Sequence, residues 1–215
     1  MLTIEKTVLP SHEQWEIIIK GMRNPMNSWD KSDTIYGDTM MFLGEADHRL
    51  MANLAKGGAV HAKYRRMIPV FVTINAPLYW WKEFDTYKVG TVCNSCSTMH
   101  KIHAKELTLD DFSHEHLRVA GKAVLLKTIE ALNAEREAFI GHLKGDKQCW
   151  YSMIQLVPTS YNQKRTIMLN DEVLANIYHS RKNHKLDEWH TFCDWIRSLP
   201  YSELIIGGTE DGKID

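Results

Sequence analysis

The longest regular pattern in the sequence is a helical spacing of apolar side chains that begins after Ser113. The positions that keep this spacing are Leu117, Ala120, Val124, Leu125, Thr128 and Leu132, and the pattern continues to Phe139. Side chains three and four residues apart lie on the same face of a helix. The pattern therefore predicts a long core helix that ends near Gly145.

Shorter helices are predicted on both sides of this core helix. Ser11 and Gln14 match a capping box, which indicates a helix that runs to about Gly21. A second helical stripe begins at Leu43 and stops at the pair Gly57-Gly58, where a left-handed C-cap costs little. Two further helices are predicted, one with Asn170 as N-cap and with Val173, Leu174, Ile177 and Tyr178, the other with Leu186, Trp189, Phe192, Cys193 and Ile196.

Few segments have the composition of strands. The β-branched and aromatic run from Val70 to Ile74 is typical of a strand, and Arg165 to Leu169 indicates a second, short one. Trp150 to Leu156 fits a short helix or an extended piece, and the aperiodic residues from Arg23 to Thr39 predict a long loop. Several helices with few strands predict an α+β fold.

The composition sets the class of protein. A chain of 215 residues, 44% hydrophobic and 25% charged, can bury one core, so we expect a single domain over 1–206 and a polar tail over 207–215. A formal net charge of −1 gives no electrostatic reason to expect nucleic acid or an anionic membrane as the main partner. With no signal-like or membrane-spanning apolar run, we expect a cytoplasmic protein with free cysteines.

Cysteine and histidine side chains gather in one short segment. Cys93, Cys96, His100 and His103 fall near one face of a predicted helix, and both residue types ligate zinc. Structural zinc sites usually take ligands from two segments, so ordinary packing is the alternative and we predict no metal site. Cys93 and Cys96 also form a C-x-x-C pair, which suits dithiol redox chemistry where it opens a helix after a strand.

A basic cluster follows the helix predicted after Asn170. Its members are His179, Arg181, Lys182, His184 and Lys185. The local pattern fits a solvated helix junction as well as a binding site.

Segments across most of the chain together resemble the flavin-dependent thymidylate synthases, whose signature is Arg-His-Arg-x-x-Ser-x-Asn-Glu-x-Ser-x-Arg. The family has a Gly-His segment before a strand that ends in Ala-Pro, and here Gly57-Gly58 and His61 precede a strand ending at Ala76-Pro77. Counting on from Pro77 aligns Glu83 with the family's Gln and Thr86-Tyr87-Lys88 with its Arg-His-Arg. The next matches are Thr91 at the first Ser and, after one inserted residue, Asn94 and Ser97 at the Asn and the second Ser.

The C-terminal half follows the family's order of a Leu-Pro, an Asn that starts a helix, an Arg and a His-Ala-Gln-x-Glu group. The corresponding residues are Leu156-Val157-Pro158, Asn170, Leu174, Arg181, His184 and Glu188. Their spacings match except for one residue missing before His184. The resemblance implies that the α+β fold is a flavin-dependent thymidylate synthase-like fold, with a small antiparallel sheet and several packed helices.

The resemblance also implies ligand contacts. The cofactor-binding residues would be His61, Tyr87, Lys88, Asn94 and Asn170. The substrate-binding residues would be Glu83, Ser95, Ser97 and Arg181. No catalytic side chain is implied, because in the family a reduced flavin relays the one-carbon group and supplies the hydride. The role of Cys93 and Cys96 stays open.

The chain departs from the signature where the family holds its ligands. Thr86 and Tyr87 replace the first Arg and the His, and Lys88 keeps the charge of the second Arg without its bidentate geometry. Ser95 replaces the Glu, and Met99 replaces the last Arg. Replacements could come from the cations Lys88, His100, Lys101, Lys164, Arg165 and Arg181 and from the rings of Trp80, Trp81 and Tyr87, for which core packing or a solvated surface is the alternative.

The activity implied by the resemblance is transfer of a one-carbon unit from folate to the uracil ring of deoxyuridylate. FAD would be the cofactor, NADPH and methylenetetrahydrofolate the co-substrates, and a homotetramer would form the sites between subunits. The departures leave two alternatives open. One is an enzyme on this scaffold that acts on another pyrimidine nucleotide or with another one-carbon donor, and the other is a nucleotide-binding or assembly protein without flavin chemistry.

Overall fold

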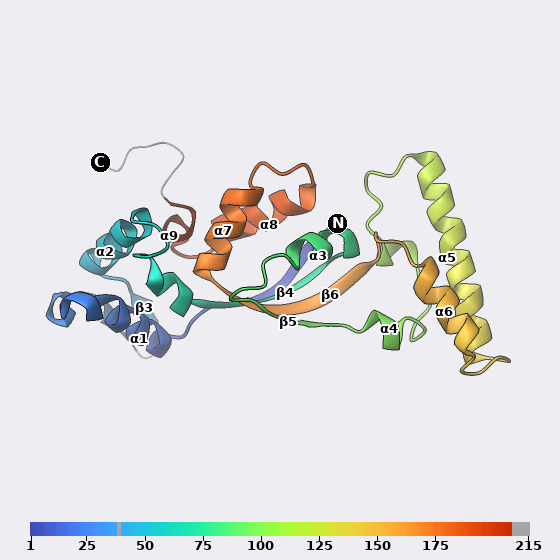
Figure 1. Ribbon diagram of the computed structural model, residues 1–215, viewed down its shortest axis with the longest axis horizontal. Coiled ribbons are helices and arrows are strands. Elements are labelled where there is room, and N and C mark those ends of the chain that lie inside the picture. The colour runs from blue at the N-terminus through green and yellow to red at the C-terminus, as the bar shows by residue number, and fades with distance from the viewer. Residues whose placement is uncertain (38–39, 208–215) are drawn as a thin grey trace. The chain divides into compact units, whose positions relative to one another are not determined.

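The structure is a computed structural model that describes residues 1–37 and 40–207 (Figure 1). Its strands are β1 (Thr3–Val8), β2 (Ile35–Tyr36), β3 (Met41–Phe42), β4 (Pro69–Pro77), β5 (Val92–Ser95) and β6 (Asn162–Asn170). Its helices are α1 (His12–Arg23), α2 (Glu45–Lys56), α3 (Leu78–Phe84), α4 (Thr98–Lys101), α5 (Val119–Ile140), α6 (Lys147–Leu156), α7 (Asp171–Arg181), α8 (Asp187–Ser198) and α9 (Ser202–Ile206). The predicted α+β class is confirmed.

Four strands form one sheet in the order β1-β4-β6-β5, and β2 pairs with β3 in a separate antiparallel ribbon. The two strands predicted from sequence are confirmed, since they lie inside β4 and β6. Alternate residues of β4, from Val70 to Ala76, are buried, which is the period of a strand with one face on the core. All four residues of β5 are exposed, so this strand leaves no apolar pattern in the sequence.

The chain forms two compact units. Unit 1 comprises Met1–Glu5, Thr73–Thr86 and Cys93–Thr166, and unit 2 comprises Lys6–Val72, Tyr87–Val92 and Ile167–Asp215. The polar tail predicted over 207–215 lies, from residue 208 on, outside the described residues.

The core of unit 1 is built on α5 and α6, which lie side by side (Figure 1). Its buried side chains are Ile102, Leu107, Phe112, Leu125, Ile129, Leu132 and Met153. The long helix is confirmed, but it begins at Val119, and three positions predicted to be core, Leu117, Ala120 and Val124, are exposed. Because α5 carries apolar residues on both faces, their spacing alone does not identify the buried face.

The core of unit 2 gathers α1, α2 and the 3-10 turn Lys63–Met67. The predicted capping box is confirmed: the Ser11 hydroxyl accepts from the Gln14 amide at 3.3 Å, and the Gln14 side chain accepts from the Ser11 amide at 2.9 Å. The predicted end of α2 at Gly57-Gly58 is confirmed: Gly57 is the C-cap, with φ −74°, and Gly58 after it has the left-handed φ of +81°.

The segment from Cys93 to His103 is not one helix. Cys93 lies in the exposed strand β5, and the Cys96 amide continues its pairing by donating to the Lys164 carbonyl at 2.9 Å. Only the four residues of α4 are helical, so the Cys and His side chains do not share a helix face. Within 1–37 and 40–207, no group of three or more His, Cys, Asp or Glu side chains is placed to hold a metal ion. No helix in these ranges has the length and apolar character to cross a membrane.

Asp47, a fully buried residue of α2, holds the segment that was predicted as a loop from Arg23 to Thr39. Its carboxylate accepts from Arg23 Nε at 2.6 Å, from the hydroxyls of Ser32 and Thr34 at 2.7 Å each, and from the amides of Asp33 and Thr34. This segment contains two 3-10 turns and β2, and its residues 38 and 39 lie outside the described part. Burial alone would raise the pKa of Asp47, but the hydrogen bonds from Ser32, Thr34 and Arg23 hold it below its usual value.

We expect Asp47→Ala to lower the free energy of unfolding by about 3–5 kcal/mol, because it leaves the buried Arg23 guanidinium unpaired. The lowered pKa means that Asp47 stabilises the fold above the carboxyl's unfolded pKa of about 4 and that this contribution is lost as pH falls below it. Urea unfolding of the variant, of wild type and of the exposed control Asp30→Ala tests this. Similar losses for both variants at pH 7 would contradict it.

Candidate functional site

The residues that the resemblance assigned to ligands fall into two sets. Unit 2 holds His61, Tyr87, Lys88, Asn170 and Arg181, and unit 1 holds Glu83, Asn94, Ser95 and Ser97. Each set has its own local geometry.

Arg181, the last residue of α7, is the centre of the unit 2 set, and we name its surroundings the Arg181 cluster: Tyr87, Arg181, His184 and Trp189. Arg181 Nε donates to the Tyr87 hydroxyl at 2.9 Å. The guanidinium carbon lies 4.8 Å from the centroid of the Trp189 ring and 5.6 Å from that of Tyr87. The His184 and Trp189 rings meet edge to face at 6.2 Å. The arrangement fixes the plane of an arginine between aromatic faces.

Local sequence explains this placement. Asn170 caps α7 by accepting from the Val173 amide at 3.1 Å, as predicted, and α7 ends with a cation, which suits the partial negative charge of a helix C-terminus. Trp189 belongs to the buried stripe of α8 and is fully buried. Its ring is therefore held by core packing and offers Arg181 a rigid face.

The loop 87–92 runs close to the start of α7. Gly90 has φ +81°, and a Cβ added there would lie 3.0 Å from Asn170 Nδ2 and 3.2 Å from Val173 Cγ2. In the same loop, Thr91 Oγ1 is buried without a hydrogen-bond partner among the described residues. Lys88 is exposed and makes no ion pair within the described ranges. The loop thus exposes one cation and buries a hydroxyl that makes no hydrogen bond within the described residues.

His61, the remaining predicted residue of unit 2, lines a cavity of about 500 Å³. Met22, Leu54, Tyr64 and Met67 are among its other walls. The cavity is mostly apolar, so it suits part of a ring system better than a phosphate.

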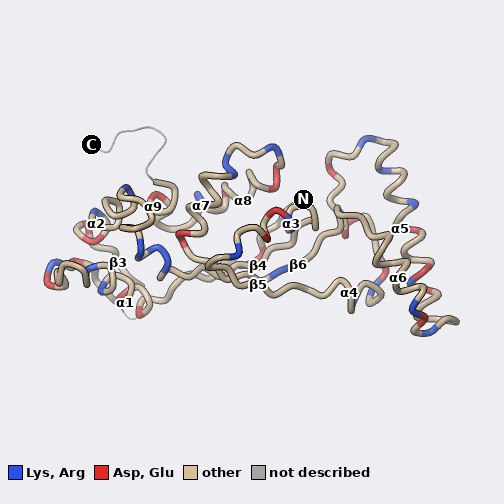
Figure 2. Tube along the Cα trace, viewed as in Figure 1, with Lys and Arg blue, Asp and Glu red and all other residues tan. Residues whose placement is uncertain are grey.

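In unit 1, Arg165 of β6 makes several contacts, and Figure 2 shows basic residues in this strand. Its Nη1 lies 2.8 Å from Asp85 Oδ1, its Nε donates to Gln163 Oε1 at 2.9 Å, and its guanidinium carbon lies 4.4 Å from the Trp81 ring centroid. Its Nη1 is also 3.9 Å from Cys93 Sγ. These contacts satisfy Arg165 inside unit 1, so it is fixed in place rather than extended into solvent.

The four predicted residues of unit 1 lie on α3, β5 and α4. Glu83 is half-buried on α3, and Asn94 and Ser95 are exposed on β5. Ser97 caps α4, accepting from the His100 amide at 3.2 Å with its hydroxyl 2.7 Å from His100 Nδ1. The structure does not gather these four into one cluster.

Ser97 lines a polar cavity of about 310 Å³ in unit 1. Lys101 and Tyr161 share this cavity, and Lys101 has no ion pair within the described ranges. Burial raises the pKa of Tyr161, and the charge of Asp111 adds to this effect. The tyrosine therefore stays a neutral hydroxyl in a cavity that also contains a lysine. The carboxylates of Glu5, Asp110 and Asp111 line the same cavity, so its lining carries charges of both signs.

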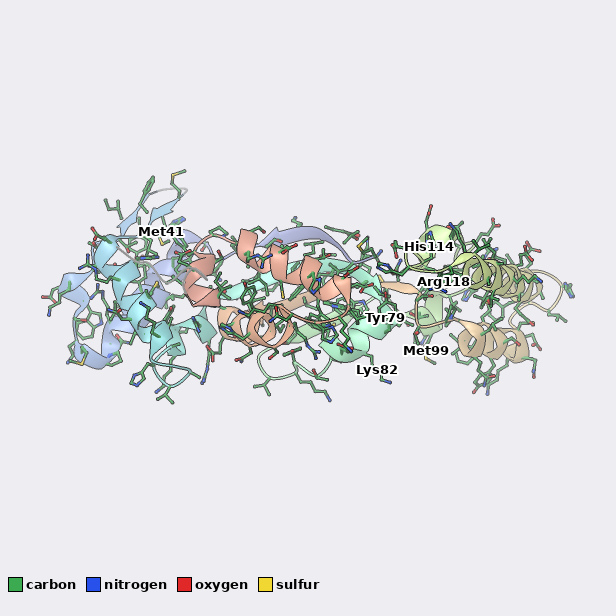
Figure 3. The ribbon with its side chains drawn as sticks, turned by 90° about the horizontal axis from the view of Figure 1, so that it is seen from above. Met41, Tyr79, Lys82, Met99, His114 and Arg118 are labelled. Carbon is green, nitrogen blue, oxygen red and sulfur yellow. The ribbon has the colours of Figure 1, made fainter. Side chains whose placement is uncertain are left out.

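The exposure of the side chains shows where Trp80, Trp81 and Met99 lie. Trp80 and Trp81 are fully buried, so they belong to the core, and Arg165 occupies the face of the Trp81 ring. Met99, which the resemblance aligned with the family's last Arg, is 51% exposed on α4 (Figure 3).

Comparison with solved structures identifies the fold. Thymidylate synthase X from Helicobacter pylori, solved with FAD and dUMP, matches with a TM-score of 0.63 at 17% identity over 94% of each chain. A second H. pylori structure of the flavin-dependent enzyme, also with FAD and dUMP, matches with a TM-score of 0.61 at 16% identity over 94% of this chain and 95% of that one. The UMP/dUMP methylase PolB from Streptomyces cacaoi, bound with 5-Br dUMP, matches with a TM-score of 0.61 at 11% identity over 97% of this chain and 95% of its own.

These matches confirm the predicted flavin-dependent thymidylate synthase-like fold. No protein-family model and no curated protein matches the sequence significantly. At such low identities the likeness shows the fold alone.

Sequence reasoning did not include Trp189, Asp85 and Gln163 among the functional contacts. Trp189 was predicted to be a core residue, and it is buried. The helical spacing of core residues does not indicate that an arginine lies over its ring. Asp85 meets Arg165 across 80 positions of sequence, a pairing that only the sheet creates.

We expect Gly90→Ala to destabilise the protein more than Gly58→Ala does. Both glycines have φ +81°, so both variants pay the cost of a left-handed alanine, about 1 kcal/mol. Only at Gly90 does the new Cβ press on Asn170, whose side chain caps α7, and we expect a further loss of about 1 kcal/mol or more. Equal midpoints in urea unfolding would show that the close approach carries no cost.

Proposed function

We propose that this protein binds FAD and a pyrimidine nucleotide and transfers a one-carbon unit from methylenetetrahydrofolate to the uracil ring of deoxyuridylate. NADPH would supply the electrons, and we expect the reaction to take place in the cytoplasm. The solved structures with this fold support the proposal, because the H. pylori structures hold FAD and dUMP and the S. cacaoi methylase holds 5-Br dUMP.

The observation that carries the proposal is the hydrogen bond between Arg181 and Tyr87. The resemblance assigned these residues to ligand contacts independently, from segments 94 positions apart, and they meet at 2.9 Å. A guanidinium held in one plane suits the oxygens of a phosphate or a pyrimidine ring. We therefore assign nucleotide binding to Arg181 and a cofactor contact to Tyr87.

The loop 87–92 has chemistry that fits a flavin. The exposed Lys88 ammonium suits phosphate oxygens or the polar edge of a ring, and Gly90 keeps the loop close to Asn170. In unit 2 we propose His61, Tyr87, Lys88 and Asn170 as FAD contacts. When bound, FAD would supply the hydride and relay the one-carbon unit, so the residues of the chain bind and orient rings.

Four residues of unit 1 are also proposed as ligand contacts. Asn94 is proposed as a further cofactor contact, and Glu83, Ser95 and Ser97 as substrate contacts. The exposed Asn94 and Ser95 side chains make no interaction within the described residues, which leaves their polar groups available to ligands.

A second candidate is a diverged protein that binds a pyrimidine nucleotide and modifies another substrate or has no flavin chemistry. The observation that favours it is Met99, a half-exposed thioether where the family has its last Arg. A thioether is a weak acceptor and gives a phosphate no charged donor.

We also propose a homotetramer, supported by the exposed apolar residues of α5. Val119 is 89% exposed and Val124 65% on one side of the helix, Leu126 is 44% exposed on another, and Leu125 and Leu132 are buried. A helix that is apolar on all sides is normally covered.

The charges of α5 indicate that a second copy is the cover. Basic residues lie in its first half and mostly acidic residues in its second (Figure 2), the reverse of what the helix dipole favours. An antiparallel copy related by a two-fold axis would set each half against the opposite charge.

Purified protein is expected to take up FAD and to show flavin absorption that shifts when dUMP is added. Arg181→Ala is expected to weaken dUMP binding about tenfold or more, because a hydrogen bond to a charged group contributes about 1.5–3 kcal/mol. Titration calorimetry measures the affinity, with Arg66→Ala, an exposed arginine of the same unit, as the control. Unchanged dUMP affinity in Arg181→Ala would show that Arg181 is not part of the site. A colourless protein that does not bind added FAD would favour the second candidate function.

Val124→Glu is expected to reduce the mass of the protein in solution, because the proposed contact would bury an unpaired carboxylate at a cost of several kcal/mol. Sedimentation velocity at one concentration compares wild type, this variant and Asn53→Glu, which adds the same charge at an exposed position of α2. A monomeric wild type, or a variant of unchanged mass, would contradict the self-association through α5.

A further inference from the structure

A separate pocket in unit 2 involves none of the residues proposed above for flavin or nucleotide. This cavity, which we name the Asp171 pocket, has a volume of about 380 Å³. Its walls include Trp15 of α1, Met41 of β3 (labelled in Figure 3), Val70 of β4, Asp171 of α7 and Tyr201. A cavity of this size accommodates a molecule of one or two rings.

Asp171 is the unusual member of the lining. Its side chain is 7% exposed and makes no hydrogen bond within the described residues. Burial raises the pKa of this carboxyl to about 8, and the nearby charge of Arg65 opposes the shift only in part. Buried carboxyls are normally hydrogen-bonded, so an unpartnered one that faces a cavity has unused binding capacity.

Arg65 and Tyr64, which interact electrostatically with Asp171, make their hydrogen bonds to other groups, and Arg65 Nε has no partner among the described residues. The Arg65 guanidinium donates to the Leu204 carbonyl, and its Nη1 lies 3.8 Å from Glu172 Oε2. Tyr64, whose pKa is raised by burial and to a lesser extent by Asp171, donates its hydroxyl to the Met51 carbonyl at 3.0 Å. The fold therefore leaves Asp171 unpaired even though an arginine and a tyrosine lie nearby.

The rest of the pocket favours a flat, mostly apolar molecule. The Trp15 and Tyr201 rings meet edge to face, with centroids 6.0 Å apart and planes at 77°. Val70 and Met41 add apolar walls. None of the described residues that line the pocket is Lys or Arg, so its lining holds no permanent positive charge for a phosphate. Ser11 and His12, at the start of α1, are its other polar members.

We propose that the Asp171 pocket binds a small planar heterocycle that carries an amino group beside a ring nitrogen, held by two parallel hydrogen bonds to the Asp171 carboxyl. A protonated carboxyl presents one donor and one acceptor side by side, which match the ring nitrogen and the amino group. If the ring nitrogen takes the proton, the carboxylate accepts from both groups and the pair gains charge assistance. Trp15 and Tyr201 then contact the ring.

The test compares two probes of the same shape on the purified full-length protein. We expect 2-aminoquinoline to bind about tenfold or more tightly than quinoline, which lacks the amino donor, because a site built for a hydrogen bond rejects the analogue without it. Isothermal titration calorimetry measures both affinities. Equal affinities, or no binding of either probe, would overturn the proposal.

Two variants separate recognition of the polar edge from recognition of the ring. Asp171→Leu is expected to abolish the preference for the aminated probe without lowering the melting temperature, because it replaces an unpaired buried acid by an apolar side chain. Trp15→Phe is expected to weaken both probes while the preference remains. If Asp171→Leu does not fold, Asp171→Asn serves instead and is expected to bind 2-aminoquinoline several-fold more weakly, since an amide cannot share the proton. A preference that survives in Asp171→Leu, or unchanged binding of 2-aminoquinoline to Asp171→Asn, would overturn the proposal.

Discussion

The pairing of β4 with β6 is the constraint on which the remaining elements depend. β4 leads through Pro77 into α3, and β6 leads through Asn170 into α7. In unit 1 the indole of Trp81 donates to the Gln163 carbonyl at 2.8 Å, and in unit 2 the Asp171 amide donates to the Ile68 carbonyl at 3.3 Å. A slip of one residue would turn every side chain of the two strands to the opposite face, and neither the Arg181 cluster nor the contacts of Arg165 would form.

Periodicity and capping made the regular parts of the fold predictable. Ser11 and Asn170 cap helices as their side-chain chemistry requires, and the β-branched run in β4 is a strand. The exposed strand β5 has no apolar period, so the Cys93 segment was assigned wrongly to a helix. On α5, apolar residues such as Val124 lie on the face turned away from the core, and their spacing could not reveal this.

The candidate site was only partly predictable for a related reason. The spacing of the family's motifs identified Tyr87 and Arg181 as candidates, because Tyr87 lies at a set number of residues after Pro77 and Arg181 after Asn170. The spacing could not identify Trp189, which contacts Arg181 because α8 packs on α7. It could not identify Asp171 either, whose side chain lacks a hydrogen bond because Arg65 donates to the Leu204 carbonyl instead. Contacts across long stretches of sequence leave no local trace, whereas capping and strand composition do.

The two best-placed arginines use the same kind of support. Arg165 lies over Trp81 and Arg181 over Trp189, and in both cases the indole is fully buried. The chain thus lacks the arginines of the family's signature but seats other arginines on rigid rings. This arrangement limits side-chain motion, so less entropy is lost when such a guanidinium engages a ligand.

The way in which the segment from Arg23 to Thr39 is attached also determines which solution conditions can detach it. This segment is held by a carboxylate and its donors, and all four cysteines of the chain are free thiols. No covalent bridge contributes to its anchoring, so reducing or oxidising conditions leave the attachment through Asp47 unchanged. The exposed Cys93 and Cys96, by contrast, lie in the other unit, so oxidation of these thiols would alter β5 without touching the Asp47 network.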